Sequence, residues 1–214
     1  MNYRHGYHAG NFADVVKHVV LVAILSHLKK KDTGFSVIDS HAGRGLYDLR
    51  DAAPQATGEA QGGIARLADI AAADGALGAY LDVVRECGSQ RYPGSPLIAA
   101  KLLRPQDRLA AIEKHPDEAA ILMDVLAPFR NAVTETGDGY GRMVKLVPPP
   151  SRRGLIVIDP PFEAVDEFEM LARAPGGGGA QIRQRDLSGL VSLSRKAPST
   201  VLSAKCWQRA WPRP

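Results

Sequence analysis

The chain has few cysteines, few aromatic residues and no long uninterrupted apolar run. Its two cysteines, Cys87 and Cys206, provide neither a disulfide framework nor metal-ligand spacing, so a reducing cytoplasm is the expected location. The best apolar stretch, residues 15–28, is interrupted by lysine and histidine, which argues against a membrane span and indicates a core helix. These features point away from disulfide-rich secreted domains and membrane proteins and toward a soluble globular protein.

The size and charge of the chain limit what it can be. With 214 residues, 45% of them hydrophobic and only 6% aromatic, it can bury one ordinary core and carry a small inserted subdomain. The net charge of +4 and the pI near 9.1 suit an anionic partner such as nucleic acid, but they also suit any slightly basic protein. Charge therefore permits a nucleic-acid partner without identifying one.

Strand patterns alternate with helical patterns along the first 165 residues. The expected strands are 35–39, 108–113, 132–134 and 154–158. The expected helices begin after Asn11 and after Ser95, which we predict to be N-caps. Strands that alternate with helices predict an α/β fold with a mostly parallel sheet and helices on both faces.

The region between the first two strands has a different character. Residues 50–90 are rich in alanine, show helical spacing and contain no good strand, so they indicate a small helical insertion. The expected division is an N-terminal helix and first core strand at 1–49, a helical insertion at 50–92, the rest of the core at 93–165 and an atypical tail at 166–214.

The quartet Asp159-Pro160-Pro161-Phe162 directly follows the apolar run 154–158. Proline has no N–H to give a sheet, so the run is predicted to be a buried strand that delivers Asp159 to its carboxyl edge, where open α/β sheets bind ligands. A carboxylate, backbone carbonyls and an aromatic ring suit a flat amino-substituted base: the oxygens accept its NH2 protons and Phe162 stacks on it. The alternative interpretation is a proline-rich turn with no chemical role.

The other predicted strands also end in loops that carry an acid. The first leads into Asp39-Ser40-His41-Ala42-Gly43-Arg44-Gly45, whose glycines permit a tight turn close to a ligand. The second ends at Glu113, an acid placed to bind ribose hydroxyls, and the third leads into Gly137-Asp138-Gly139. Any one of these loops could arise by chance, but four of them at one edge of the sheet together indicate a ligand-binding site.

The ordered set of loops resembles class I S-adenosylmethionine-dependent methyltransferases that act on adenine N6, whose hallmark is an acid or Asn followed by Pro-Pro and an aromatic residue. Over about residues 1–165 the chain resembles, more specifically, the bacterial 23S ribosomal RNA adenine-N6 methyltransferase family (RlmJ-like). The segments that carry this resemblance are Tyr3-Arg4-His5, His8-Ala9-Gly10-Asn11, Ala13-Asp14, Lys17-His18, Asp39, His41-Ala42-Gly43, Tyr92-Pro93-Gly94-Ser95-Pro96 and Ser151-Arg152-Arg153-Gly154-Leu155. The resemblance implies a class I, Rossmann-like sheet with a small helical insertion.

The resemblance also implies an activity and a set of site residues. It implies methyl transfer from S-adenosylmethionine to the N6 amine of an adenine in 23S ribosomal RNA, by a cytoplasmic monomer that contacts no membrane. The family's cofactor contacts fall on His18, His41, Ser95, Glu113, Asp138, Gly139 and Asp159. The catalytic positions fall on Asp159, Pro160 and Phe162, and the RNA substrate contact falls on Tyr3. Asp159 is expected to orient the amine first and accept its proton second, because the amine becomes acidic only as the new bond forms.

Two other functions stay open at this point. A metal-dependent nuclease or DNA-catabolism protein could build a metal site from Asp14 and the histidines near the N-terminus, which are His5, His8, His18, His27 and His41. Hydrogen-bonded histidines beside a cofactor pocket are the simpler interpretation, and no metal is assigned. A non-enzymatic nucleic-acid-binding module would use Lys29-Lys30-Lys31 and Arg152-Arg153, although such runs usually form solvated faces.

The composition changes after about residue 165. A class I methyltransferase sheet needs roughly three more strands there, each visible as a run of β-rich residues. The segment 174–179 is instead Ala-Pro followed by four glycines, and arginine, serine and proline recur through Pro214. We therefore expect a tail without strands, a sheet that is incomplete at its C-terminal side, and an exposed edge on the strand before Asp159.

Overall fold

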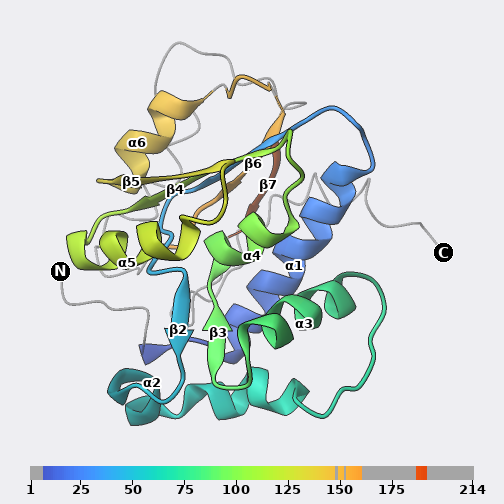
Figure 1. Ribbon diagram of the computed structural model, residues 1–214, viewed down its shortest axis with the longest axis vertical. Coiled ribbons are helices and arrows are strands. Elements are labelled where there is room, and N and C mark those ends of the chain that lie inside the picture. The colour runs from blue at the N-terminus through green and yellow to red at the C-terminus, as the bar shows by residue number, and fades with distance from the viewer. Residues whose placement is uncertain (1–6, 148, 152, 161–186, 192–214) are drawn as a thin grey trace.

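A five-stranded sheet, with every described strand parallel to its neighbours, forms the centre of the protein (Figure 1). The structure is a computed structural model that describes residues 7–147, 149–151 and 153–160, and the backbone of 187–191. The strands lie in the order β5 (Ala132–Thr136), β4 (Arg108–Glu113), β1 (Ser36–Asp39), β6 (Gly154–Val157) and β7 (Leu187–Val191). The predicted α/β class with a parallel sheet is confirmed.

The strand register brings the ends of β1, β4 and β6 to one edge of the sheet. Asp39, the last residue of β1, is paired with Ala111 of β4 and with Val157 of β6. Glu113 lies two residues after Ala111, at the end of β4, and Asp159 lies two residues after Val157, just beyond β6. Parallel pairing therefore gathers three acids at the carboxyl edge, where ligands bind in folds of this kind.

Helices cover both faces of the sheet. α1 (Phe12–Lys29), α4 (Ser95–Leu102) and α5 (Pro116–Leu126) share one large apolar cluster with one face. α6 (Gly139–Leu146) closes a smaller cluster on the other face. The buried members of the smaller cluster are Ile38, Ile112, Tyr140, Met143, Ile156 and Ile158. Most of the core thus lies between the sheet and the helices α1, α4 and α5. Of these helices, α1 and α4 also carry residues of the site.

The two helix starts that we predicted differ in accuracy. Asn11 caps α1 as expected, because its side-chain oxygen accepts the backbone N–H of Asp14 at 2.9 Å. For α4 the predicted cap is wrong by one position: Gly94 is the N-cap and Ser95 is the first helical residue. The Ser95 side chain is therefore available to the site instead of the helix end.

The segment between β1 and β4 contains short helices framed by two strands that the sequence did not reveal. The helices are α2 (Ala52–Thr57), the 3-10 turns η2 (Glu59–Gly62) and η3 (Ile64–Leu67), and α3 (Gly75–Cys87). The strands β2 (Leu46–Asp48) and β3 (Arg91–Pro93) pair antiparallel. Three residues are too few to show an alternating pattern, which explains why both strands were missed.

The insertion holds the start of α1 through several contacts. Glu59 bonds to His8 Nδ1 at 3.1 Å and accepts a hydrogen bond from Asn11 Nδ2 at 2.9 Å. The backbone N–H of Ile64 donates to the carbonyl of Gly10 at 2.9 Å. A Cβ at Gly63 would lie 2.1 Å from the same carbonyl oxygen, so only glycine allows this close approach. The insertion therefore fixes the segment that leads into α1.

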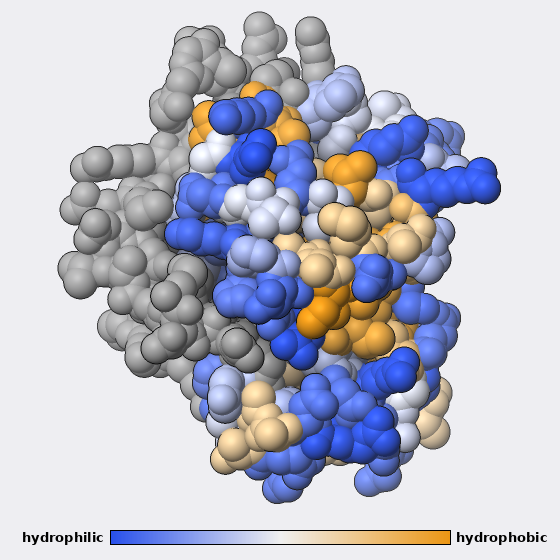
Figure 2. Space-filling view, turned by 60° about the vertical axis from the view of Figure 1, so that its left-hand side comes forward, coloured by the Kyte–Doolittle hydropathy of each residue, from blue (hydrophilic) through white to orange (hydrophobic). Residues whose placement is uncertain are grey.

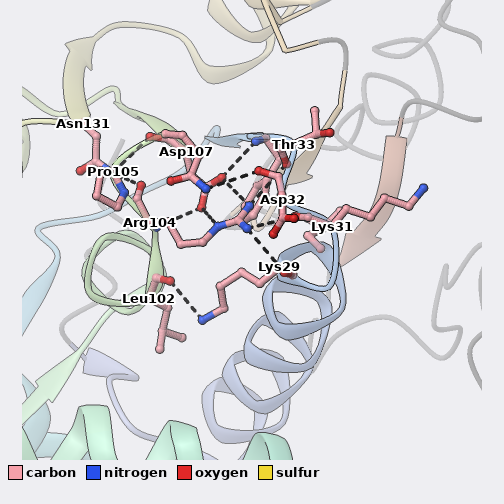
Figure 3. Close-up of polar contacts among 12 residues, drawn as sticks. Lys29, Lys31, Asp32, Thr33, Leu102, Arg104, Pro105, Asp107 and Asn131 are labelled. Carbon is pink, nitrogen blue, oxygen red and sulfur yellow. Dashed lines mark hydrogen bonds and ion pairs between the residues drawn. The ribbon is translucent and has the colours of Figure 1, made fainter.

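A polar cluster around Arg104 joins the opposite, amino edge of the sheet to the end of α1 (Figure 3). The guanidinium binds Asp107 through Nε and Nη2 at 2.9 and 3.0 Å and donates to the carbonyl of Lys31 at 2.9 Å. Asp107 is fully buried and also accepts the backbone N–H of Phe35. Burial alone would raise the pKa of Asp107, but the hydrogen bonds from Arg104 and Phe35 lower it.

The expectation of a tail without strands is wrong for residues 187–191. β7 pairs parallel with β6, with a register shift between Gly154 and Ile156. The sequence Leu-Ser-Gly-Leu-Val hides this strand, because serine and glycine interrupt its apolar run. β7 also covers the edge of β6 that we expected to be exposed. The other tail residues, 166–186 and 192–214, lie outside the described residues.

The described surface is mostly polar. Its exposed large apolar side chains are Tyr7, Phe12, Ile121, Met123, Val133 and Val144. Figure 2, which turns the left-hand side of Figure 1 forward, shows a limited apolar area bordered by polar side chains. Within the described part of the chain, no helix has the length and apolar character that a membrane crossing requires.

Candidate active site

A polar hollow lies at the carboxyl edge of the sheet. It encloses about 240 Å³, including space that is open to solvent. The residues that line it are Lys17, His18, His41, Ala42, Tyr47, Gly94, Ser95 and Asp159. Four of the predicted site residues therefore come together here, from α1, the loop after β1, the start of α4 and the loop after β6.

Lys17 joins two carboxylates at this hollow. Its Nζ donates to Asp14 Oδ1 at 2.8 Å and to Asp159 Oδ2 at 2.5 Å. The lysine side chain is only 6% exposed. Burial alone would lower the pKa of Lys17, but the charges of Asp14 and Asp159 more than offset this and raise it. Lys17 thus stays cationic and holds Asp159 in one position.

Asp39 is a buried acid next to this ion pair. Its side chain is 1% exposed, and neither carboxylate oxygen meets a well-aligned donor within the described residues. Burial raises the pKa of Asp39 to about 6, although Ser95 and the charge of Lys17 act in the opposite direction. A cationic ligand bound next to Asp39 would therefore stabilise the ionised form of its carboxylate.

His41 is neutral at physiological pH and its proton can be placed. Burial lowers its pKa to about 4, against the opposing charges of Asp159 and Asp138. Ser40 donates its hydroxyl proton to the carbonyl of Val157 at 3.0 Å, and its Oγ lies 2.8 Å from His41 Nδ1. Since Ser40 has one proton to give, Nδ1 is the donor in the second bond. Nε2 of His41 is then an acceptor.

His18 is as deeply buried as Asp39, at 1% exposure. Its Nδ1 lies 2.8 Å from the hydroxyl of Tyr92, and the two rings stack with centroids 5.6 Å apart. Tyr92 in turn lies 3.1 Å from the hydroxyl of Tyr80. The histidine is therefore held from behind by a chain of tyrosines while it lines the hollow.

Glu113 organises the loop that follows β1. Its Oε2 accepts the backbone N–H of Gly43 at 2.8 Å, and its Oε1 accepts that of His115 at 2.7 Å. Each carboxylate oxygen has a second lone pair. Glu113 can therefore hold this loop and still accept hydroxyl protons from a bound ribose.

Replacing Glu113 with alanine is expected to weaken S-adenosylmethionine binding by about 1 to 3 kcal/mol, because buried hydroxyls and two backbone N–H groups lose their acceptor. Calorimetry with S-adenosylhomocysteine measures the effect. Asp117→Ala is the matched control, since this exposed carboxylate lies on the following helix. Unchanged affinity in Glu113→Ala would remove the ribose assignment.

The remaining predicted residues occupy different positions. Asp138 is the N-cap of α6 and accepts the backbone N–H of Gly141 at 2.8 Å. A Cβ at Gly139 would lie 2.0 Å from the carbonyl oxygen of Ser40, so glycine brings this loop against the loop after β1. Pro160 is buried beside Asp159. Phe162 and Tyr3 lie outside the described residues.

Lys17 and Tyr47 line the hollow although we assigned them no role from the sequence, and Asp14, which we considered only as a metal ligand, is the partner of Lys17. Asp14 and Lys17 are buried on the same side of α1 as Leu21, Leu25 and Leu28. Two charges within the apolar stripe of a helix are costly unless they are paired, and this was the signal that could have found them. Tyr47 gave no such signal, because its strand is only three residues long.

The structure also bears on the metal hypothesis. Among the described residues, no group of three or more His, Cys, Asp or Glu side chains is arranged to hold a metal ion. His8 instead bonds to Glu59, and His18 bonds to Tyr92. His5 lies outside the described residues. Of the described histidines, His18 and His41 line the hollow, and each has a hydrogen-bonding partner.

Comparison with known proteins adds independent information. The model of a family described as ribosomal RNA large subunit methyltransferase D, RlmJ, matches residues 32–186. Two curated relatives carry the name ribosomal RNA large subunit methyltransferase J. The relative from Haemophilus influenzae is 38% identical over 179 residues, which cover 81% of this chain and 64% of the relative. The relative from Escherichia coli is 41% identical over 197 residues, which cover 90% of this chain and 69% of the relative.

A solved structure agrees with these relatives. A crystal structure of a protein from Legionella pneumophila is 37% identical, with a TM-score of 0.72 over 78% of this chain and 63% of that one. The chain thus spans about two thirds of the length of the proteins it matches. From the extent of the family match and the identity to both relatives, we conclude that the chain belongs to the RlmJ family of ribosomal RNA large subunit methyltransferases.

Proposed function

We propose that this protein transfers a methyl group from S-adenosylmethionine to the N6 amine of an adenine in 23S ribosomal RNA. One observation carries the proposal: Asp159, followed by Pro160, lies at the carboxyl end of β6 with its carboxylate bound to Lys17 at the edge of the hollow. Family membership supports the reaction class and the RNA substrate. A cytoplasmic location and a monomeric state stay predictions.

The chemistry of the donor set fits S-adenosylmethionine. This molecule carries an ammonium, a carboxylate, a sulfonium, a ribose diol and an adenine. The buried carboxylate of Asp39 complements a cationic group, and the hydroxyl of Ser95 and the cation of Lys17 complement a carboxylate. Glu113 suits the ribose diol, and Asp138 suits the adenine amino group. When bound, S-adenosylmethionine supplies a methyl group that is already activated on sulfur.

The protein's own residues then have to hold the target amine. Oδ2 of Asp159 accepts from Lys17, which leaves Oδ1 as an acceptor for an N6 proton. The carbonyl oxygen of Pro160 offers a second acceptor on a rigid backbone. The bond to Lys17 fixes the position of the carboxylate, and this suits a group that orients the amine before it accepts a proton. Alignment, more than proton abstraction, is the proposed contribution of Asp159.

A transfer assay with methyl-labelled S-adenosylmethionine tests the proposal. We expect label on adenine N6 of transcribed 23S ribosomal RNA, little label on DNA of matched length, and no loss of activity with a metal chelator. Degradation of either nucleic acid that requires a divalent metal, without label transfer, would favour the nuclease. Binding of RNA without transfer, hydrolysis or affinity for S-adenosylhomocysteine would favour the non-enzymatic module.

A further inference from the structure

Two buried tyrosines stand behind the histidine of the hollow. Tyr80 comes from α3 in the insertion, Tyr92 from β3 and His18 from α1, and their exposures are 0%, 0% and 1%. The hydroxyls of Tyr80 and Tyr92 are 3.1 Å apart, and the hydroxyl of Tyr92 is 2.8 Å from His18 Nδ1. The three groups form one continuous hydrogen-bonded chain that ends at the site.

Only one direction of these hydrogen bonds gives each of the two tyrosine hydroxyl protons an acceptor. Within the described residues, the hydroxyl of Tyr80 meets a single hydrogen-bond partner, the hydroxyl of Tyr92. A buried hydroxyl that has no acceptor for its proton destabilises the fold by the full desolvation free energy of that group. Tyr80 therefore donates to Tyr92. Tyr92 must then give its own proton to His18 Nδ1, because its oxygen already accepts from Tyr80. In the neutral imidazole, the ring proton is therefore on Nε2.

The opposite direction of the hydrogen bonds would leave the hydroxyl proton of Tyr80 without an acceptor in the described part of the chain. If His18 carried its proton on Nδ1, that N–H would donate to Tyr92, and Tyr92 would donate to Tyr80. The proton of Tyr80 would then face a protein interior with no solvent exposure and no further acceptor among the described residues. This arrangement leaves a buried hydroxyl proton without an acceptor. The first arrangement satisfies both tyrosine hydroxyls and Nδ1, and it places the imidazole proton on Nε2 of a side chain that lines the hollow.

We propose that Tyr80 and Tyr92 are positioning residues that fix His18 as the Nε2–H tautomer, so that this histidine donates a hydrogen bond to the methyl donor. The inference rests on the proposed function for the identity of that ligand. Because Nδ1 is taken by Tyr92, the proton that His18 can offer in the hollow is on Nε2. The carboxylate of S-adenosylmethionine is the anionic acceptor that matches such a donor.

The proposal also gives the insertion a role in the site. Tyr80 is the first donor of the chain and belongs to α3, which packs along α1 (Figure 1). The insertion thus reaches His18 through two hydroxyls without contacting the ligand. His41 provides a contrast, because the direction of its bond to Ser40 leaves its Nε2 as an acceptor. The hollow therefore presents one histidine as a donor and the other as an acceptor.

Nitrogen NMR of the histidine-labelled, ligand-free protein tests the tautomer directly, with His18 assigned through the His18→Gln spectrum. We expect the Nδ1 of His18 to show the signature of a hydrogen-bonded acceptor and its Nε2 that of a protonated nitrogen. Tyr92→Phe should move the Nδ1 signal toward that of an acceptor without a donor. A protonated Nδ1 in the unmodified protein would overturn the proposal, whatever the methyl-transfer assay shows.

Calorimetry with S-adenosylhomocysteine tests the consequence. Tyr92→Phe is expected to raise Kd about tenfold, the effect of losing one buried hydrogen bond that orients the ligand-binding ring. Tyr80→Phe should raise it by only about threefold, because Tyr92 can still donate to His18. Tyr7→Phe, at an exposed tyrosine, is the matched control and should leave Kd unchanged. Equal affinities in all three variants would contradict the positioning role, while absence of binding by the unmodified protein would count against the proposed function instead.

Discussion

Alanine in place of Asp159 is expected to reduce single-turnover methyl transfer by a factor of about 10³ or more. The carboxylate lies at the end of β6 and is fixed by Lys17, so its loss removes the group that would align the target amine. The cofactor's other predicted contacts, among them His18 and Glu113, remain in place. S-adenosylhomocysteine should therefore still bind, and calorimetry on the same preparation shows whether it does.

Asparagine at the same position separates alignment from proton acceptance. An amide oxygen can still accept an N6 proton in a hydrogen bond, but it is too weak a base to remove one. We therefore expect Asp159→Asn to retain clearly more activity than Asp159→Ala, with a loss of about 10- to 100-fold. If the two variants were equally inactive, proton acceptance would be the main role, and near-normal transfer by Asp159→Ala would dismiss both roles.

Methionine at Lys17 is expected to lower the free energy of unfolding by about 3 to 5 kcal/mol at pH 8. The substitution preserves much of the side-chain volume but leaves Asp14 and Asp159 without their shared cation. Asp39, whose pKa burial already raises to about 6, would lose a stabilising charge as well. Urea denaturation followed by circular dichroism measures the change, and Lys17→Arg, which keeps the charge, is the control.

The pH dependence of this variant gives a second check. A carboxyl group whose pKa is higher in the folded than in the unfolded state destabilises the fold when ionised, so stability should rise as pH falls from about 7 toward 4. Asp39 contributes in this direction in the unmodified protein, and Lys17→Met should enlarge the effect. A stability deficit that is the same at pH 5 and pH 8 would show that packing, and not charge, explains the loss.

The sheet and its carboxyl edge were predictable because they depend on local patterns. Val37 and Ile38, or Leu155 and Ile156, are apolar runs ended by an acid, and parallel pairing then brings those acids together. Lys17 could not be placed in the same way. Its partner Asp159 is 142 residues away, and no local pattern records which distant carboxylate a buried lysine will meet.

Short or interrupted elements account for the other differences. β2 and β3 have three residues each and form only because they pair with each other. β7 contains Ser188 and Gly189, and its pairing with β6 includes a register shift. The tyrosine chain behind His18 is equally invisible in the sequence, since Tyr80 and Tyr92 resemble ordinary core residues until their hydroxyls are placed.

The strand order has a consequence for the way the protein is made. β1 lies between β4 and β6, so Ser36 pairs with Arg108 on one side and with Gly154 on the other. During synthesis at about 5 to 20 residues per second, roughly 7 to 30 s separate the addition of Lys17 from that of Asp159, which follows 142 residues later. The central strand β1 can pair with β4 once residues 108–113 have been made, but its second neighbour, β6, is made only at the end of this interval. The carboxyl edge is therefore among the last parts of the described fold to assemble.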